Sequence, residues 1–232
     1  TVCVIDTGIN YSHSDLGGCY GNNSANSNCK VAGGIDYCAD NVNCQTSPDG
    51  IPEDIHGHGT HVSGIIAANG SIRGVAPESR IVMIKACNST GSCSESSIEA
   101  GINWCVGNSS ALNISVISMS LGGDLYANYC NLDTLASAIN AAFAKNISVV
   151  AASGNDGSLI GISSPACIQN ATPVGSTTKL DVISSFSNRN ALVKLMAPGG
   201  DGGAGGINST YPGGYASMSG TSMATPHVAG AI

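Results

Sequence analysis

Apolar residues along the chain gather in seven short runs that are rich in β-branched residues. The runs are residues 2–5, 31–35, 81–86, 116–119, 147–152, 174–176 and 193–196. Each run is continuous rather than alternating, which is typical of strands that are covered on both faces. The pattern therefore favours a parallel sheet that is buried between two other layers.

Two of the intervening segments have the spacing of amphipathic helices. One has apolar residues at positions 98, 102, 105 and 106 after Ser94 and Ser96, and the other at 132, 135, 136, 139 and 143 after Asn131. Ser and Asn at these places are candidate helix caps. Because strands alternate with helices and the chain has no internal repeat or linker, we expect a single-domain α/β fold with three αβα layers and a mainly parallel central sheet.

The chain begins inside a strand pattern and stops inside a helical pattern. Residues 2–5 already form an apolar run, and residues 229–232 end without a helix C-cap. We expect residues 1–232 to form one domain that is truncated at both ends.

The charge balance argues against several classes of partner. The 232 residues include 8 Lys and Arg and 15 Asp and Glu, for a formal net charge of -7. The few basic residues are scattered from Lys30 to Lys194, so they form no patch for nucleic acid or anionic lipid. No apolar run approaches the ~20 residues of a membrane helix. We expect no nucleic-acid partner, and no membrane contact within this segment.

The 10 cysteines are an even set, and none has the C-x-x-C spacing of common zinc sites. They indicate disulfides, with buried free thiols as the alternative. The short loop between Cys87 and Cys93 suits a local bridge, and the other pairings stay open. Nine N-x-[ST] triplets also fit an exported protein. We therefore expect an extracellular or cell-surface location.

Three motifs place reactive side chains where strands end or helices begin. Asp6 ends a strand in VIDTGI (residues 4–9), His58 lies in HGHGTHVSGIIA (56–67), and Ser222 lies in SGTSMATPHVAG (219–230). We expect Pro226 to be tolerated because N–H groups in the first turn of a helix have no intrahelical acceptor. Taken singly, the three side chains also suit a turn cap, a metal ligand and a helix cap.

Together, in the order Asp, His, Ser, the motifs resemble those of the subtilisin-like serine proteases, or subtilases. SMSLGG (residues 118–123) is similar to the substrate-binding segment of that family, and AASGN (151–155) to its oxyanion-hole segment. The resemblance covers nearly all of the chain. It implies a subtilisin-like peptidase catalytic domain that cleaves peptide bonds through an acyl-enzyme.

The resemblance assigns catalytic roles to four residues. Ser222 would be the nucleophile, His58 the general base and then acid, and Asp6 the partner that fixes the His58 tautomer. Asn155 would donate its amide to the oxyanion. His56 also precedes a glycine, but the match of residues 58–64 favours His58. The remaining motif histidines, His61 and His227, would be structural.

Substrate binding is implied along two backbone edges and around a specificity pocket. The implied residues are Gly91, Ser92, Cys93, Ser120, Leu121, Gly122, Ala152, Ser153, Gly154 and Asp156. No acidic cluster is evident near the first specificity pocket, so we expect a broad or apolar preference at P1, the residue before the scissile bond. Asp156, at the pocket rim, would add a mild preference for basic side chains.

A calcium ion is a further implication, although the chemistry requires no cofactor. Asp15 matches a calcium ligand of many relatives, with a capping or turn aspartate as the alternative. NGSIR (residues 69–73) is shorter than the calcium loop of subtilisin itself, which speaks against the strong site there. Ser164–Pro165 resembles a cis peptide bond of the family.

The remaining expectations concern partners and competing functions. We expect a protein or peptide substrate, an N-terminal propeptide outside this segment, and a monomer. The alternative function is a catalytically silent subtilase-fold module for binding or adhesion, although all four catalytic positions are intact. A dinucleotide-binding oxidoreductase is disfavoured because no G-x-G-x-x-G follows the first strand.

Overall fold

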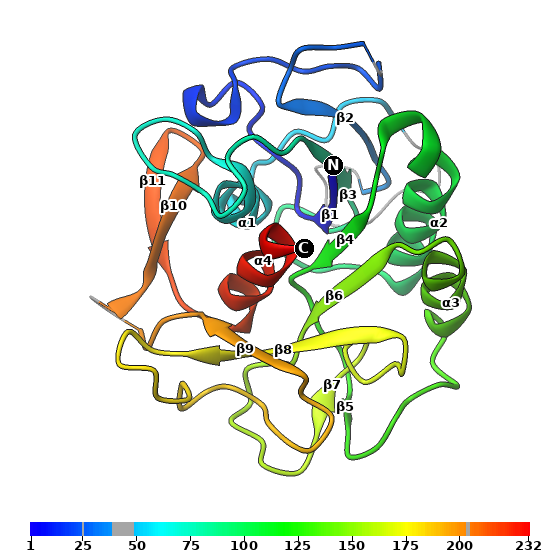
Figure 1. Cartoon of the computed structure of the whole chain (residues 1–232), viewed down its shortest axis with the longest axis vertical. Coiled ribbons are helices and arrows are strands. Elements are labelled where there is room, and N and C mark those ends of the chain that lie inside the picture. The colour runs from blue at the N-terminus through cyan, green and yellow to red at the C-terminus, as the bar shows by residue number, and fades with distance from the viewer. Residues whose placement is uncertain (25, 39–48, 203–204) are drawn as a thin grey trace.

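The computed structural model of the chain describes residues 1–24, 26–38, 49–202 and 205–232. Its central sheet has seven parallel strands in the order β2-β3-β1-β4-β6-β8-β9 (Figure 1). The strands are β1 Val2–Asp6, β2 Val31–Asp36, β3 Ile81–Lys85, β4 Val116–Met119, β6 Ser148–Ala152, β8 Ala171–Thr177 and β9 Leu195–Pro198. Each predicted apolar run forms one of these strands, with shifts of up to three residues at the ends.

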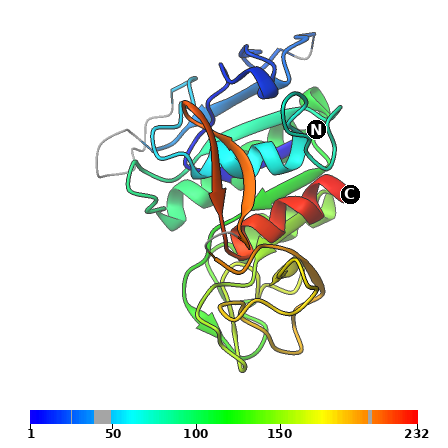
Figure 2. The ribbon, with the colours of Figure 1, turned by 90° about the vertical axis from the view of Figure 1, so that its left-hand side faces the viewer.

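Helices cover both faces of the sheet (Figures 1 and 2). Helices α2 (Glu95–Leu112) and α3 (Ala136–Ala144) pack on one face, and α1 (His58–Ala67) and α4 (Thr221–Ala231) on the other. Successive strand residues point to opposite faces, so Cys3 and Ile5 join the core under α2 while Val2 and Val4 join the core under α1 and α4. The predicted three-layer αβα fold is confirmed.

The two predicted helices differ in how well their boundaries were anticipated. Helix α2 begins after Ser94, whose hydroxyl accepts a hydrogen bond from Ser97 N, as predicted. The second prediction placed Leu132 and Phe143 on the buried face, but both side chains are exposed. Helix α3 begins only at Ala136, because Asp133 Oδ1 accepts a hydrogen bond from Leu135 N and holds residues 133–135 in a turn.

Small elements complete the fold around this core. They are the 3-10 helix η1 (Ser14–Leu16), the strand pair β5 (Leu125–Tyr126) and β7 (Ile162–Ser163), and the hairpin of β10 (Ile207–Tyr211) and β11 (Gly214–Met218). The hairpin packs on α1 through polar contacts. Ser209 Oγ and Thr210 Oγ1 donate to carbonyls of α1, and His61 Nε2 lies 3.1 and 3.0 Å from two hairpin carbonyls.

Disulfides join both distant and neighbouring parts of the chain. The described pairs are Cys3–Cys105, Cys19–Cys29, Cys87–Cys93 and Cys130–Cys167. Cys38 is also disulfide-bonded, and Cys44 lies outside the described residues. Disulfides, including the local bridge at 87–93, are thus confirmed over free thiols for the described cysteines. In the same residues, no helix has the length and apolar character needed to cross a membrane.

Candidate active site

The carboxyl edge of the sheet brings the four predicted catalytic residues together. Asp6 ends β1, Asn155 follows β6, and His58 and Ser222 lie in the first turns of α1 and α4. Asp6, His58 and Ser222 line one cleft of about 640 Å³. Asn155 lines a cavity of about 250 Å³ that shares Ser222 with that cleft. Crevices at this edge are where open parallel sheets bind ligands.

A short hydrogen bond joins the carboxylate to the imidazole. His58 Nδ1 lies 2.7 Å from Asp6 Oδ1, which also accepts from Thr7 N at 2.8 Å. Asp6 is only 1% exposed, and this contact makes Nδ1 the protonated nitrogen of neutral His58. Burial lowers the pKa of His58, but the Asp6 charge and hydrogen bond, with a smaller effect of Asp54, raise it above the usual 6.5 overall.

Glycines permit the close approach of β1 and α1. A Cβ at Gly59 would lie 2.1 Å from Gly8 O, and Gly8 has a φ of 114°. Only glycine fits this crossing without a shift of backbone. Gly8 and Gly59 therefore permit the close approach that places Asp6 against His58.

Asp54 organises the turn that leads into α1, and our sequence interpretation did not single it out. Its Oδ1 accepts from Thr7 Oγ1, His56 N and Gly57 N, and its Oδ2 from Thr60 N and Thr60 Oγ1. The side chain is 4% exposed and works as a remote cap of the helix. An aspartate a few residues before a helix start was the available signal.

Ser222 is tied to the end of β4 by two hydrogen bonds. Ser222 Oγ donates to Ser120 O at 3.1 Å, and Ser120 Oγ donates to Ser222 O at 2.8 Å. Pro226 lies beyond the first turn of α4, so the expectation that it is tolerated because it lies in that turn was wrong. Its missing N–H would have bonded to Ser222 O, and Ser120 Oγ takes that place instead. No hydrogen bond joins Ser222 to His58 among the residues described.

The side-chain amide of Asn155 has a fixed orientation. Thr221 N and Thr221 Oγ1 donate to Asn155 Oδ1 at 2.8 and 3.0 Å. Because a backbone N–H only donates, the accepting atom is the carbonyl oxygen, and Nδ2 is presented on the other side. A side chain at Gly220 would begin 3.5 Å from Nδ2. The arrangement leaves a donor beside the first turn of α4.

A family model described as "Subtilase family" matches residues 1–232. The chain belongs to the subtilase family. It is 40% identical to Subtilisin Savinase of Lederbergia lenta over 99% of this chain and 73% of that protein. It is 40% identical to the thermophilic serine proteinase of Bacillus sp. (strain AK1) and 39% identical to alkaline serine exoprotease A of Vibrio alginolyticus, with 99% of this chain covered in each case.

A solved structure titled as a cold adapted subtilisin-like serine proteinase shares the fold. Its TM-score is 0.75 at 36% identity, over 99% of this chain and 72% of that one. The chain spans 50% and 37% of the lengths of the Bacillus and Vibrio relatives. The family and fold expected from the motifs are thus confirmed for this subtilase.

Most of the predicted substrate residues line the two cavities of this subtilase. The larger cleft includes Gly91, Ser92, Cys93, Ser120, Leu121 and Gly122, and the smaller cavity includes Leu121, Gly122, Ala152, Gly154 and Asp156. Ser153 lines neither, because its buried hydroxyl donates to Asn188 O. Its role as a substrate contact stays a prediction without support from this geometry.

Acidic side chains are distributed unevenly over the two cavities. Asp156 is the acidic residue of the smaller one, where its carboxylate accepts from Asn188 Nδ2 at 2.9 Å. Glu95, Asp124 and Asp133 line the larger cleft together with Asp6. The peptide bond Ser164–Pro165 beside the cleft is cis, as expected.

Asp15 is a buried carboxylate that accepts hydrogen bonds from two other segments. Ile72 N and Tyr215 Oη each donate to Asp15 Oδ2 at 3.0 Å. Burial raises the pKa of Asp15, but the hydrogen bonds from Ile72, Ser71 and Tyr215 lower it overall. Both donors thus occupy one carboxylate oxygen, Oδ2. No group of three or more His, Cys, Asp or Glu side chains that could hold a metal occurs in the described part of the chain. Calcium at Asp15 stays a prediction.

Of the other motif histidines, His61 and His227 lie outside both cavities. His56 lines the larger cleft with His58, but the ring that contacts Asp6 is that of His58. His61 is fully buried beneath the hairpin, and burial is the main cause that lowers its pKa to about 4. His227 Nδ1 bonds to Met223 O within α4, and burial lowers its pKa as well.

Proposed function

We propose that this chain is a serine endopeptidase whose nucleophile is Ser222. The hydroxyl attacks the scissile carbonyl carbon while His58 Nε2 takes its proton. His58 then gives that proton to the leaving amine. In the second step His58 takes a proton from a water molecule that attacks the ester carbon of the acyl-enzyme, and returns a proton to Ser222 Oγ as the acyl group leaves. Asp6 holds the imidazole and stabilises its protonated form.

The oxyanion of the tetrahedral intermediate would be held by two donors. One is Asn155 Nδ2, whose direction follows from the two bonds that its Oδ1 accepts from Thr221. The other is the backbone N–H of Ser222, because N–H groups in the first turn of a helix have no intrahelical acceptor. Loss of one such donor lowers kcat by roughly 10²–10³-fold in a member of this family.

The observation that carries the proposal is the 2.7 Å contact between His58 Nδ1 and Asp6 Oδ1 in the cleft that Ser222 also lines. The contact leaves His58 Nε2 as the proton acceptor of the neutral ring. In the resting geometry Ser222 Oγ donates to Ser120 O, so a rotation of the hydroxyl must precede attack. Catalytic hydrogen bonds commonly tighten only when substrate is bound.

The smaller cavity supports a broad or apolar preference at the residue before the scissile bond. Its lining is dominated by short or uncharged groups, and the carboxylate of Asp156 is already engaged by Asn188. A peptide-library cleavage profile tests this preference. A profile restricted to basic residues at that position would contradict it.

The disulfides support an extracellular location, because such bonds persist in oxidising compartments. All the described cysteines are oxidised. Intact mass measured without reductant should show five disulfides after secretion, since the chain has 10 cysteines. Full activity of protein kept reduced in a cytosol would contradict this location.

A fluorophosphonate probe tests the activity directly, because it labels only activated serines. We expect labelling of the parent at Ser222, none in Ser222→Ala, and a large loss in His58→Ala. Ser110→Ala, which removes an exposed serine on α2, should label like the parent. Failure of the correctly folded parent to react would refute the proposal and favour a silent binding module.

A further inference from the structure

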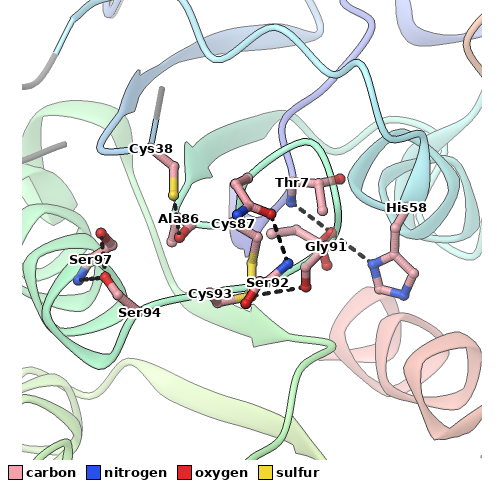
Figure 3. Close-up of a disulfide and its surroundings, with 12 residues drawn as sticks. Thr7, Cys38, His58, Ala86, Cys87, Gly91, Ser92, Cys93, Ser94 and Ser97 are labelled. Atoms are coloured by element: carbon pink, nitrogen blue, oxygen red, sulfur yellow. Dashed lines mark hydrogen bonds and ion pairs between the residues drawn. A yellow bond between two sulfur atoms is a disulfide. The ribbon is translucent and has the colours of Figure 1, made fainter. Parts of the chain in front are cut away.

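One wall of the cleft is a small loop closed by a disulfide. Cys87 and Cys93 face each other as an antiparallel bridge, with their Cα atoms 4.0 Å apart. The loop follows β3, which pairs with the strand that ends at Asp6, and it leads into α2. In Figure 3 it lies between the first turn of α2 and His58. Cys87, Gly91, Ser92 and Cys93 all line the cleft.

A buried asparagine organises the interior of the loop. Asn88 is 4% exposed, and its Oδ1 accepts from Thr90 N, Thr90 Oγ1 and Ser92 N at 3.0, 2.8 and 3.0 Å. Its backbone N donates to Ser92 O, and its backbone O accepts from Gly91 N. These five hydrogen bonds all lie within the loop.

The same pairing leaves an open backbone edge toward the cleft. Ser92 uses both its N–H and its C=O inside the loop, and Gly91 uses its N–H there as well. Gly91 O and Cys93 N have no backbone partner among the described residues. Ser120, Leu121 and Gly122 line the opposite wall of the cleft. An extended peptide between the walls can thus pair as an added strand.

His56 restricts the loop from a further side. A Cβ at Gly91, whose φ is 81°, would lie 3.0 Å from His56 Nε2. The turn of the loop therefore lies close to His56, on the segment that leads into α1.

We propose that the Cys87–Cys93 disulfide and Asn88 preorganise this edge for extended peptide substrates, so that binding does not have to order the loop. The inference rests on the proposed function. Cys87, Cys93 and Asn88 act as positioning residues, because they hold the peptide-binding edge rather than contact the reacting atoms. Holding a binding segment in its bound conformation improves affinity by removing the entropy lost on ordering. A small substrate that does not reach residues 91–93 gains nothing from this device.

The test compares two substrates in three proteins. The substrates are a six-residue peptide and a single-residue ester, and the proteins are the parent, Cys87→Ser with Cys93→Ser, and Cys19→Ser with Cys29→Ser. The last pair removes another short-loop disulfide, whose cysteines do not line the cleft. Fluorophosphonate labelling of Ser222 reports the integrity of the reactive serine in each protein.

In the 87/93 variant, the ratio of peptide to ester kcat/KM should fall about tenfold, mainly through KM, as expected from about 1.4 kcal/mol of ordering free energy. The 19/29 control should keep the parent ratio. An unchanged ratio in the 87/93 variant, or an equal loss for both substrates, overturns the inference.

Asn88→Ala keeps the disulfide and decides the matter if the double variant does not fold. A fall in the same ratio supports preorganisation, and an unchanged ratio overturns it. A parent that neither labels nor hydrolyses either substrate refutes the proposed function and this inference with it. A parent that is active while the ratio stays unchanged refutes only the inference.

Discussion

The buried histidine under the β10–β11 hairpin should make the fold sensitive to mild acid. His61 Nε2 faces the carbonyls of Ile207 and Ala216, so Nε2 carries the proton, and Nδ1 has no partner among the described atoms. A second proton on Nδ1 would be a buried charge without an acceptor. This agrees with a pKa that burial lowers from 6.5 to about 4.

The expected magnitude follows from linkage. The unfolded chain takes up a proton near pH 6.5, whereas the folded chain resists until about pH 4, so stability is lost as the pH falls through this window. The free energy of unfolding should drop by about 2 kcal/mol at pH 5 and about 3 kcal/mol at pH 4, relative to pH 8. Above pH 7 this contribution is fully present.

Urea unfolding at several pH values measures the effect. The Ser222→Ala background removes self-digestion, and His61→Asn in that background removes the titrating group while keeping an amide donor. Other ionisable groups are common to both proteins, so the difference between their two pH curves isolates His61. Parallel curves between pH 8 and pH 4 would refute the reasoning.

Three further predictions follow from contacts near the cleft and in the core. The neutral ring of His58 is the proposed base and its pKa is raised, so kcat/KM should fall with acid with an apparent pKa above 6.5. A pH–rate profile with an apparent pKa at or below 6.5 would contradict this. Gly59→Ala forces a Cβ to 2.1 Å from Gly8 O, so the free energy of unfolding should fall by about 3 kcal/mol, and a calorimetric melting temperature equal to that of the parent would be the opposing result. Replacing Cys3 and Cys105 by alanine removes a disulfide that links residues 102 positions apart, so the free energy of unfolding should fall by about 4 kcal/mol. An unchanged midpoint of denaturant unfolding would contradict this.

The parallel sheet could be predicted because strands buried on both faces need continuous apolar runs. The β10–β11 hairpin could not be predicted in this way. Ser209 and Thr210 are polar and would be expected at the surface, but both are buried and donate hydrogen bonds to α1 carbonyls. The start of α3 was misplaced because a fully exposed Leu132 was counted as core, while a local Asp133 turn decides the boundary.

The candidate site was predictable to the extent that each motif carries its own local geometry. Glycines near Asp6 and His58 signal the close crossing of strand and helix. The role of Pro226 was misjudged, because the partner that replaces its hydrogen bond, Ser120, comes from another strand. Asp54 was overlooked for a related reason, since its five donors meet only in the folded chain.

The placement of Ser222 on α4 has a consequence for how the molecule is made. Asp6 and His58 lie in β1 and α1, whereas Ser222 lies much further along the chain, in α4. Until α4 docks between α1 and β8, the proposed proton acceptor His58 has no serine hydroxyl beside it to activate. The proposed peptidase activity should therefore require α4 to be docked, so it should appear late in the synthesis of this segment.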